Sequence, residues 1–334
     1  CRMSLQGRCH RGVGTGPRSS SPDACGGTDG PSGSGPPGRG TILDVTRFDS
    51  ISFLTDYGLD DEFVGVCKAV IRDLAPHVTV VDLTHGIAPF DVRAGSLALA
   101  RSISYVPSGV VLAVVDPGVA TDRKAVAIEV AAGAGVVIGP DNGLLAPAVA
   151  MAGGADRAVE LTAPEFRLAA PGATFDGRDV FAPAAAHVCN GVDLGELGPE
   201  LDPALLVPAT IPLPRLEGDE LVCEVLWVDR FGNAQLNIGP DEIPAAWDDV
   251  VEVEVGAEAS TTRAAHRSVG FAGLGPGALG LVLDSTGLFA LCLDQRSAAD
   301  ELPVAPGDQV IVRSIDGGIP SPTTRVELGR RPGG

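Results

Sequence analysis

The feature that most constrains the fold is a regular alternation of short apolar runs with amphipathic segments from residue 51 onward. Residues 51–55, 78–83 and 110–115 are apolar runs of strand length. Residues 61–74 and 93–105, which separate them, carry apolar residues at helical spacing. This β-α-β-α-β order predicts an α/β domain with a largely parallel sheet.

Polar residues directly follow each expected strand of this domain. Asp56 follows the first strand, Thr84 the second and Asp116 the third. In parallel sheets, ligands bind beyond the carboxyl ends of the strands. We therefore expect a binding site at that edge of the sheet.

A second domain is expected after a segment rich in glycine and proline. Residues 191–215 have the composition of an interdomain linker. Beyond them, short strand-like runs with few helical patterns predict a small β-barrel or sandwich over residues 216–330. The runs are residues 220–228, 250–255, 279–284, 288–293 and 308–312. The α/β domain is expected over residues 47–190. Residues 1–46 contain almost no large apolar side chains that could offset chain entropy, which predicts a disordered tail.

The charge and apolar content of the chain narrow its range of partners. The formal net charge is −19, which repels phosphate backbones, so we expect no nucleic-acid partner. No apolar run approaches the roughly 18 residues of a membrane-spanning helix, and no stretch has the pattern of a secretory signal. We expect no membrane association and a cytoplasmic location. Four cysteines in apolar contexts fit that location as buried free thiols: Cys67, Cys189, Cys223 and Cys292.

Common metal and nucleophile motifs are missing from the sequence. It contains no H-E-x-x-H, no cysteine cluster with metal-ligand spacing and no G-x-S-x-G. The five histidines are scattered along the chain. We therefore expect no metal site and no cofactor.

Five short segments instead combine acidic residues, arginine and asparagine in turn contexts. In chain order they are residues 55–61, 116–123, 139–143, 174–179 and 229–233. Taken singly, each has a structural explanation, because Asp-Pro-Gly and Asp-Asn-Gly form turns and Asp56 could cap a helix. Together and in this order, they resemble the S-adenosyl-L-methionine (SAM) hydroxide adenosyltransferase family, which is related to the fluorinase and chlorinase that use SAM. The resemblance spans roughly residues 50–315.

The resemblance implies an enzyme that hydrolyses SAM, or its R-sulfonium epimer, to adenosine and methionine. Water attacks the ribose C5′ atom, so SAM is the substrate and not a cofactor. It also implies a homotrimer whose sites form between the amino-terminal domain of one subunit and the carboxyl-terminal domain of its neighbour. An isolated subunit is then expected to be inactive.

Substrate-binding roles also follow from the resemblance. Asp56 would accept hydrogen bonds from the ribose hydroxyls, and Asn233 would bind the adenine edge through its amide. Asp61 and Phe90 would line the SAM pocket, and Phe231 would pack beside the adenine. Asp229 and Ser285 would hold the methionine part.

The choice of nucleophile depends on the turn at Asp116. Halide-using relatives carry a Tyr-Pro-Ala-Thr type of turn there, whereas this chain has Asp116-Pro117-Gly118-Val119 and then Arg123, the pattern of the water-using branch. A carboxylate about 5 Å from a halide costs roughly 3 kcal/mol at an effective dielectric constant near 20. The same carboxylate can orient water or accept its proton.

One position departs from the family pattern. Water-using relatives have histidine within a Thr-Phe-His-Gly-Arg motif, where this chain has Asp176. Asp176 can accept a proton or a hydrogen bond but cannot act as a neutral imidazole base. We predict that Asp116, Arg123 and Asp176 together polarise the attacking water. A halide-using adenosyltransferase and a non-catalytic SAM- or adenosine-binding protein are the alternatives.

Overall fold

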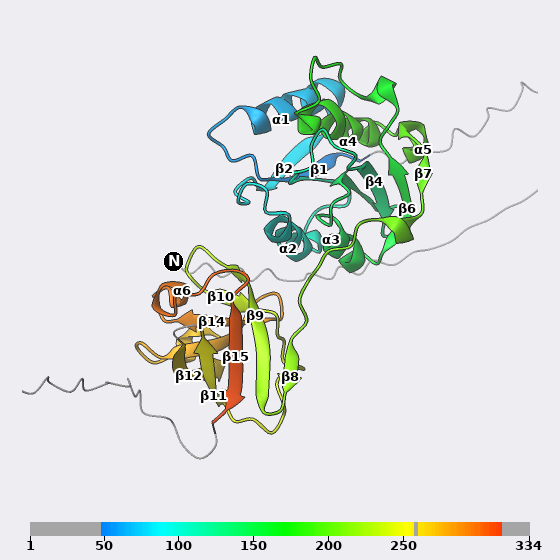
Figure 1. Ribbon diagram of the computed structural model, residues 1–334. Coiled ribbons are helices and arrows are strands. Elements are labelled where there is room, and N and C mark those ends of the chain that lie inside the picture. The colour runs from blue at the N-terminus through cyan, green and yellow to red at the C-terminus, as the bar shows by residue number, and fades with distance from the viewer. Residues whose placement is uncertain (1–47, 257–259, 316–334) are drawn as a thin grey trace, which may run out of the picture. The chain divides into compact units, whose positions relative to one another are not determined.

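The computed structural model describes residues 48–256 and 260–315, which contain an α/β domain and a β domain (Figure 1). The tail expected over residues 1–46 lies outside the described residues. The same holds for residues 316–330, the last part of the expected carboxyl-terminal domain.

A seven-stranded sheet forms the centre of the α/β domain, in the order β2-β1-β3-β5-β4-β6-β7. The first four strands in this order are parallel, and the last three add antiparallel pairs. The strands are β1 (Ser50–Thr55), β2 (Thr79–Thr84), β3 (Val110–Val114), β4 (Ala125–Val130), β5 (Gly135–Pro140), β6 (Ala155–Glu160) and β7 (Glu200–Leu201). The predicted α/β domain with its parallel strands is confirmed.

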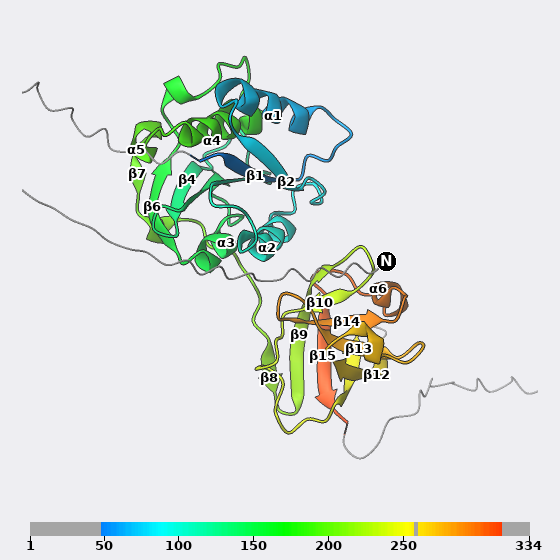
Figure 2. The same cartoon turned by 180° about the vertical axis from the view of Figure 1, so that it is seen from behind.

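Helices cover both faces of this sheet (Figure 1 and Figure 2). The helices are α1 (Phe63–Leu74), α2 (Val92–Ile103), α3 (Ala146–Met151), α4 (Ala182–Cys189) and α5 (Leu194–Leu197). Strand β3 contributes to the cores on both faces: Val110, Leu112 and Val114 pack on the side of α1 and α4, and Val111 and Ala113 on the side of α2 and α3. Because successive strand residues point to opposite faces, a strand covered on both sides is apolar throughout.

The connections open a crevice at the carboxyl ends of β1 and β3. The chain runs from β1 through α1 to β2 on one side of β1, and then through α2 to β3 on its other side. Such a reversal of direction is the usual ligand-binding point of an open α/β sheet. Asp56 and Asp116 follow β1 and β3 within two residues, so both reach this crevice.

Part of the segment expected as a linker belongs to the α/β domain. Within residues 191–215, Asp193 caps α5 by accepting a hydrogen bond from the N–H of Gly195 at 2.8 Å, and the side chain of Glu196 bonds back to Asp193. Strand β7 then pairs with β6 at the edge of the sheet. The expectation of a linker was wrong for this part, because a capping box and an edge strand compensate for the local glycine content.

The second domain is a closed β-barrel. Its strands are β9 (Glu220–Val228), β10 (Ala234–Leu236), β11 (Val250–Val255), β12 (Thr261–Ser268), β13 (Leu279–Leu283), β14 (Phe289–Leu293) and β15 (Gln309–Ser314). Strand β10 pairs with both β14 and β9, which closes the barrel, and β8 (Arg215–Glu217) extends it beside β9. In β11, Val251, Val253 and Val255 enter the core between half-buried Glu252 and Glu254. A short helix, α6 (Ala298–Glu301), precedes β15.

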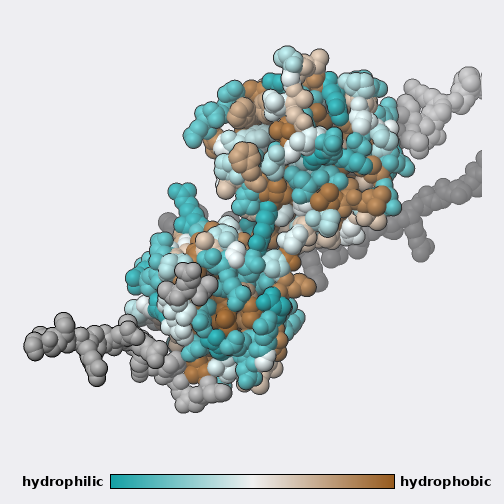
Figure 3. All heavy atoms as spheres, in the orientation of Figure 1, coloured by the Kyte–Doolittle hydropathy of each residue, from teal (hydrophilic) through white to brown (hydrophobic). Residues whose placement is uncertain are grey.

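The described surface is mixed in polarity. On the face drawn in Figure 3, hydrophilic residues surround small apolar areas. In the two described ranges, no helix combines the length and apolar character needed to cross a bilayer.

Candidate active site

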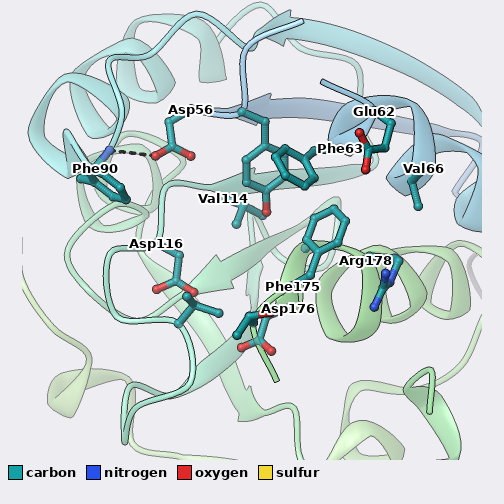
Figure 4. Close-up of a pocket in the computed structure, with 14 residues that line it drawn as sticks. Asp56, Glu62, Phe63, Val66, Phe90, Val114, Asp116, Phe175, Asp176 and Arg178 are labelled. Atoms are coloured by element: carbon teal, nitrogen blue, oxygen red, sulfur yellow. Dashed lines mark hydrogen bonds between the residues drawn. The ribbon is translucent and has the colours of Figure 1, made fainter. Parts of the chain in front are cut away.

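A pocket of about 460 Å³ lies at the carboxyl ends of β1 and β3 (Figure 4). Its lining combines carboxylates with aromatic rings and includes Asp56, Phe63, Phe90, Asp116 and Asp176. The volume falls in the range of sites for small organic ligands.

Arg123 joins the two carboxylates of Asp116 and Asp176. Its Nε donates a hydrogen bond to Asp116 Oδ1 at 3.1 Å, and its Nη2 donates to Asp116 Oδ2 and, at 2.7 Å, to Asp176 Oδ2. The side chains of Asp116, Arg123 and Asp176 are 7%, 8% and 20% exposed. The structure therefore brings together the three residues predicted to act on water, and the two-pronged contact fixes the carboxylate plane of Asp116.

Local turns explain how these side chains meet. The N–H of Gly118 donates to Asp116 Oδ1 at 3.2 Å, and the hydroxyl of Thr121 donates to the carbonyl of Gly118 at 2.6 Å. This side-chain-supported turn brings Arg123 back toward Asp116. On the other side, Asp176 directly precedes a π-helical turn, η2 (Gly177–Phe181), that leads into α4. Such turns are frequent at functional sites.

The environment of Asp116 changes its acidity. Burial raises the pKa of Asp116 above its usual range, the contact with Arg123 opposes this shift, and the nearby charge of Asp176 adds to it. A carboxylate with a raised pKa is a better proton acceptor near neutral pH than an exposed one.

Asp56 holds the loop that carries Phe90. Its Oδ2 accepts a hydrogen bond from the N–H of Phe90 at 2.9 Å, as the dashed line in Figure 4 marks. Phe90 has a φ of 69°, in the left-handed region that a bulky side chain rarely adopts. Phe90 is 70% exposed. This strained residue presents an aromatic surface beside the pocket, a combination typical of ligand contacts.

The structure differs from the prediction for some residues of this pocket. Asp61 lies exposed before α1 and is not among the residues that line the pocket, whereas the next residue, Glu62, is. Tyr57 and Phe63 also line it and were missed by sequence reasoning. The signal for Tyr57 is its position directly after Asp56, and that for Phe63 is its place at the start of α1, the helix that follows β1, because segments that follow a strand end share its crevice.

The barrel holds a separate pocket of about 410 Å³ that contains Phe231 and Asn233. Asp229 accepts hydrogen bonds from the backbone N–H groups of Phe231 and Asn233, at 2.8 and 2.9 Å, and from the side-chain amide of Asn233 at 2.8 Å. It therefore orients the amide of Asn233, and its contact with methionine stays a prediction. Ser285, between β13 and β14, is not among the lining residues of either pocket.

Across residues 48–256 and 260–315, no three His, Cys, Asp or Glu side chains come together in an arrangement that could hold a metal ion.

Known proteins are similar in sequence to both domains. The family described as SAM hydroxide adenosyltransferase N-terminal domain matches residues 51–198, and the corresponding C-terminal domain matches residues 223–311. A protein of Salinispora arenicola named (R)-S-adenosyl-L-methionine hydrolase is 46% identical over 266 residues, which cover 78% of this chain and 97% of the relative. A fluorinase of Nocardia brasiliensis is 31% identical over 212 residues, which cover 56% of this chain and 70% of the relative.

Two solved structures share the fold. An uncharacterized conserved protein from Thermotoga maritima has a TM-score of 0.71 and 35% identity and covers 79% of this chain and 99% of its own. A conserved hypothetical protein from Thermus thermophilus has a TM-score of 0.62 and 38% identity and covers 81% of this chain and 100% of its own. Both family domains match in order, and a relative with 46% identity aligns over nearly its whole length. The resemblance inferred from five short segments is thereby confirmed, and the chain belongs to the SAM hydroxide adenosyltransferase family.

Proposed function

We propose that this protein hydrolyses SAM, as its R-sulfonium epimer, to adenosine and methionine. The observation that carries the proposal is the contact of Asp116 and Asp176 with one guanidinium group in the crevice beyond β1 and β3. The name (R)-S-adenosyl-L-methionine hydrolase, given to the relative from Salinispora arenicola, supports the substrate and its configuration.

The reaction needs a positioned water and little else, because a sulfonium is already a good leaving group. The water oxygen bonds to C5′, the C5′–sulfur bond breaks, and its electron pair stays on sulfur, which leaves as the neutral thioether of methionine. The proton of the water passes to a carboxylate and then to solvent. Asp116 accepts the hydrogen bond and the proton, Asp176 supplies a second acceptor, and Arg123 holds both in place. Positioning and exclusion of bulk water supply most of the acceleration.

Charge in the pocket favours water over a halide nucleophile. Two carboxylates and one guanidinium leave one net negative charge beside the position of the nucleophile. This charge attracts a sulfonium cation and repels chloride or fluoride. Asp56, which keeps one oxygen on the N–H of Phe90, would use the other for the ribose hydroxyls.

The decisive experiment is chromatography of the purified protein incubated with each SAM epimer. We expect adenosine and methionine in equal amounts, formed faster from the R epimer. With chloride added, we expect no 5′-chloro-5′-deoxyadenosine. Formation of the chlorinated product would instead identify a halide-using adenosyltransferase. Calorimetric binding of SAM without any product would identify a binding protein.

A homotrimer with sites between subunits is part of this proposal. Among the described residues, the pocket with Asp116 is lined by the α/β domain alone and the pocket with Asn233 by the barrel alone, so the family arrangement would assign the two halves of a SAM site to different subunits. Mixing Asp116→Ala and Asn233→Ala subunits, each inactive alone, should then restore activity, because some sites in mixed trimers contain both native halves. Sedimentation should give the mass of three chains. Absence of any recovery after verified subunit exchange would contradict shared sites.

We further propose a cytoplasmic location without nucleic-acid partners. Cys67, Cys189, Cys223 and Cys292 are free and buried, and burial raises the pKa of each thiol to about 12, so none is poised for oxidation. Free thiols suit a reducing compartment, and the net charge of −19 disfavours binding to phosphate backbones.

A further inference from the structure

Tyr57, directly after Asp56, contributes a phenol ring to the same pocket as Asp116 and Asp176. The ring lies against Phe63 and Phe175, with centroid distances of 5.9 and 5.8 Å and edge-to-face geometry. Those two rings also contact each other, at 5.1 Å. This aromatic cluster of three rings restricts the ring of Tyr57 and therefore the place of its hydroxyl group.

The hydroxyl of Tyr57 lies against Gly177, the residue after Asp176. A Cβ atom added to Gly177 would overlap the hydroxyl oxygen, so every larger residue at this position would displace it. The backbone of Gly177 is not left-handed, and the glycine is therefore required for space. The missing side chain makes room for the phenol oxygen in a pocket that Asp176 also lines.

The hydroxyl is available as a hydrogen-bond donor. Burial, followed by the charges of Cys67 and the nearby carboxylates, raises the pKa of Tyr57 far above its usual value, so the phenol keeps its proton. Among the described residues, the hydroxyl of Tyr57 has no hydrogen-bond partner, whereas its backbone N–H donates to Thr55 Oγ1 at 3.1 Å. The side-chain O–H is thus left for a group that enters the pocket.

We infer that the hydroxyl of Tyr57 donates a hydrogen bond to the water that attacks C5′, an inference that rests on the proposed hydrolysis. Water has two hydrogens and two lone pairs in a tetrahedral arrangement. With its hydrogens on Asp116 and Asp176, the water can still rotate about the line between the two acceptors. A third contact, from Tyr57 to one lone pair, stops this rotation and aims the other lone pair at C5′.

The test is Tyr57→Phe, which keeps the ring and removes only the donor. We expect kcat to fall about 10- to 100-fold, while KM for SAM and the thermal midpoint stay nearly unchanged, because the lost contact is made to water and not to SAM. The chain has two tyrosines, and Tyr105, which is 80% exposed, gives the matched control. Tyr105→Phe loses the same atom and should keep native kcat.

Other outcomes separate this inference from the proposed function. If the native protein makes adenosine and Tyr57→Phe has the same kcat, the proposed role of Tyr57 is overturned, while the proposed hydrolysis still stands. A rise in KM at unchanged kcat also overturns it, since the hydroxyl would then bind SAM. If the native protein makes no adenosine, the proposed function itself is wrong.

A second variant keeps the inference testable if Tyr57→Phe folds poorly. Gly177→Ala leaves the hydroxyl on the ring but displaces it, so kcat should fall by a similar factor at nearly native KM. Native turnover in folded Gly177→Ala would contradict the geometry.

Discussion

Asp116→Ala is expected to lower adenosine formation by at least about 100-fold while SAM still binds within a few-fold of the native affinity. The carboxylate holds and deprotonates the water, a contribution of roughly 10²- to 10⁴-fold in general acid–base catalysis. Loss of its charge weakens the attraction for the sulfonium, but the expected contacts of Asp56 and Phe90 with SAM remain, because these residues line another part of the pocket. The measurements are product chromatography for turnover and calorimetry for binding.

The fold should tolerate this change, which makes the result interpretable. Arg123 keeps its hydrogen bond to Asp176 in the variant, so the guanidinium does not become an unpaired buried charge. Asp122→Ala is the matched control, since Asp122 is an exposed carboxylate in the same turn. It should show native turnover. Near-native turnover in Asp116→Ala would remove the assignment of Asp116 as proton acceptor.

Asp176→His is expected to retain or raise activity near pH 7.5 and to make it strongly dependent on pH. A histidine there assists the water only as neutral imidazole, whose pKa is about 6.5, so roughly a tenfold loss is expected between pH 7.5 and pH 5.5. In the native chain the acidic limb of the profile belongs to Asp116. Activity needs that carboxylate ionised, so it is present above the pKa of Asp116 and is lost as the pH falls through it. The measurement is kcat against pH for both proteins.

Asp176→Asn gives the opposite shift and serves as the control. Burial is the main cause of the raised pKa of Asp116, and the charge of Asp176 raises it further. Removing its charge should lower that pKa and move the acidic limb of the profile to lower pH. Three identical pH profiles would show that residue 176 does not act on the nucleophile. Loss of folding in both variants, seen by thermal melting, would mark Asp176 as a structural residue.

Local patterns in the sequence determined most elements of the two domains. The predicted runs at residues 220–228 and 250–255 coincide with β9 and β11, because inward and outward residues alternate with the period of a strand. Strand β12 escaped prediction because Arg263, His266 and Arg267 interrupt its apolar content. The capped helix within residues 191–215 escaped because glycine and proline dominate that composition.

The sequence by itself also determined which side chains lie at strand ends, and through the resemblance it indicated the family and the water-using turn at Asp116. Only the tertiary structure decided that Arg123 holds Asp116 and Asp176 together, that Asp61 lies outside the pocket and that Tyr57 lies within it. The reason is physical. Strand and helix periods depend on near neighbours in the chain, whereas a shared guanidinium or a hydroxyl over a glycine depends on how distant segments pack.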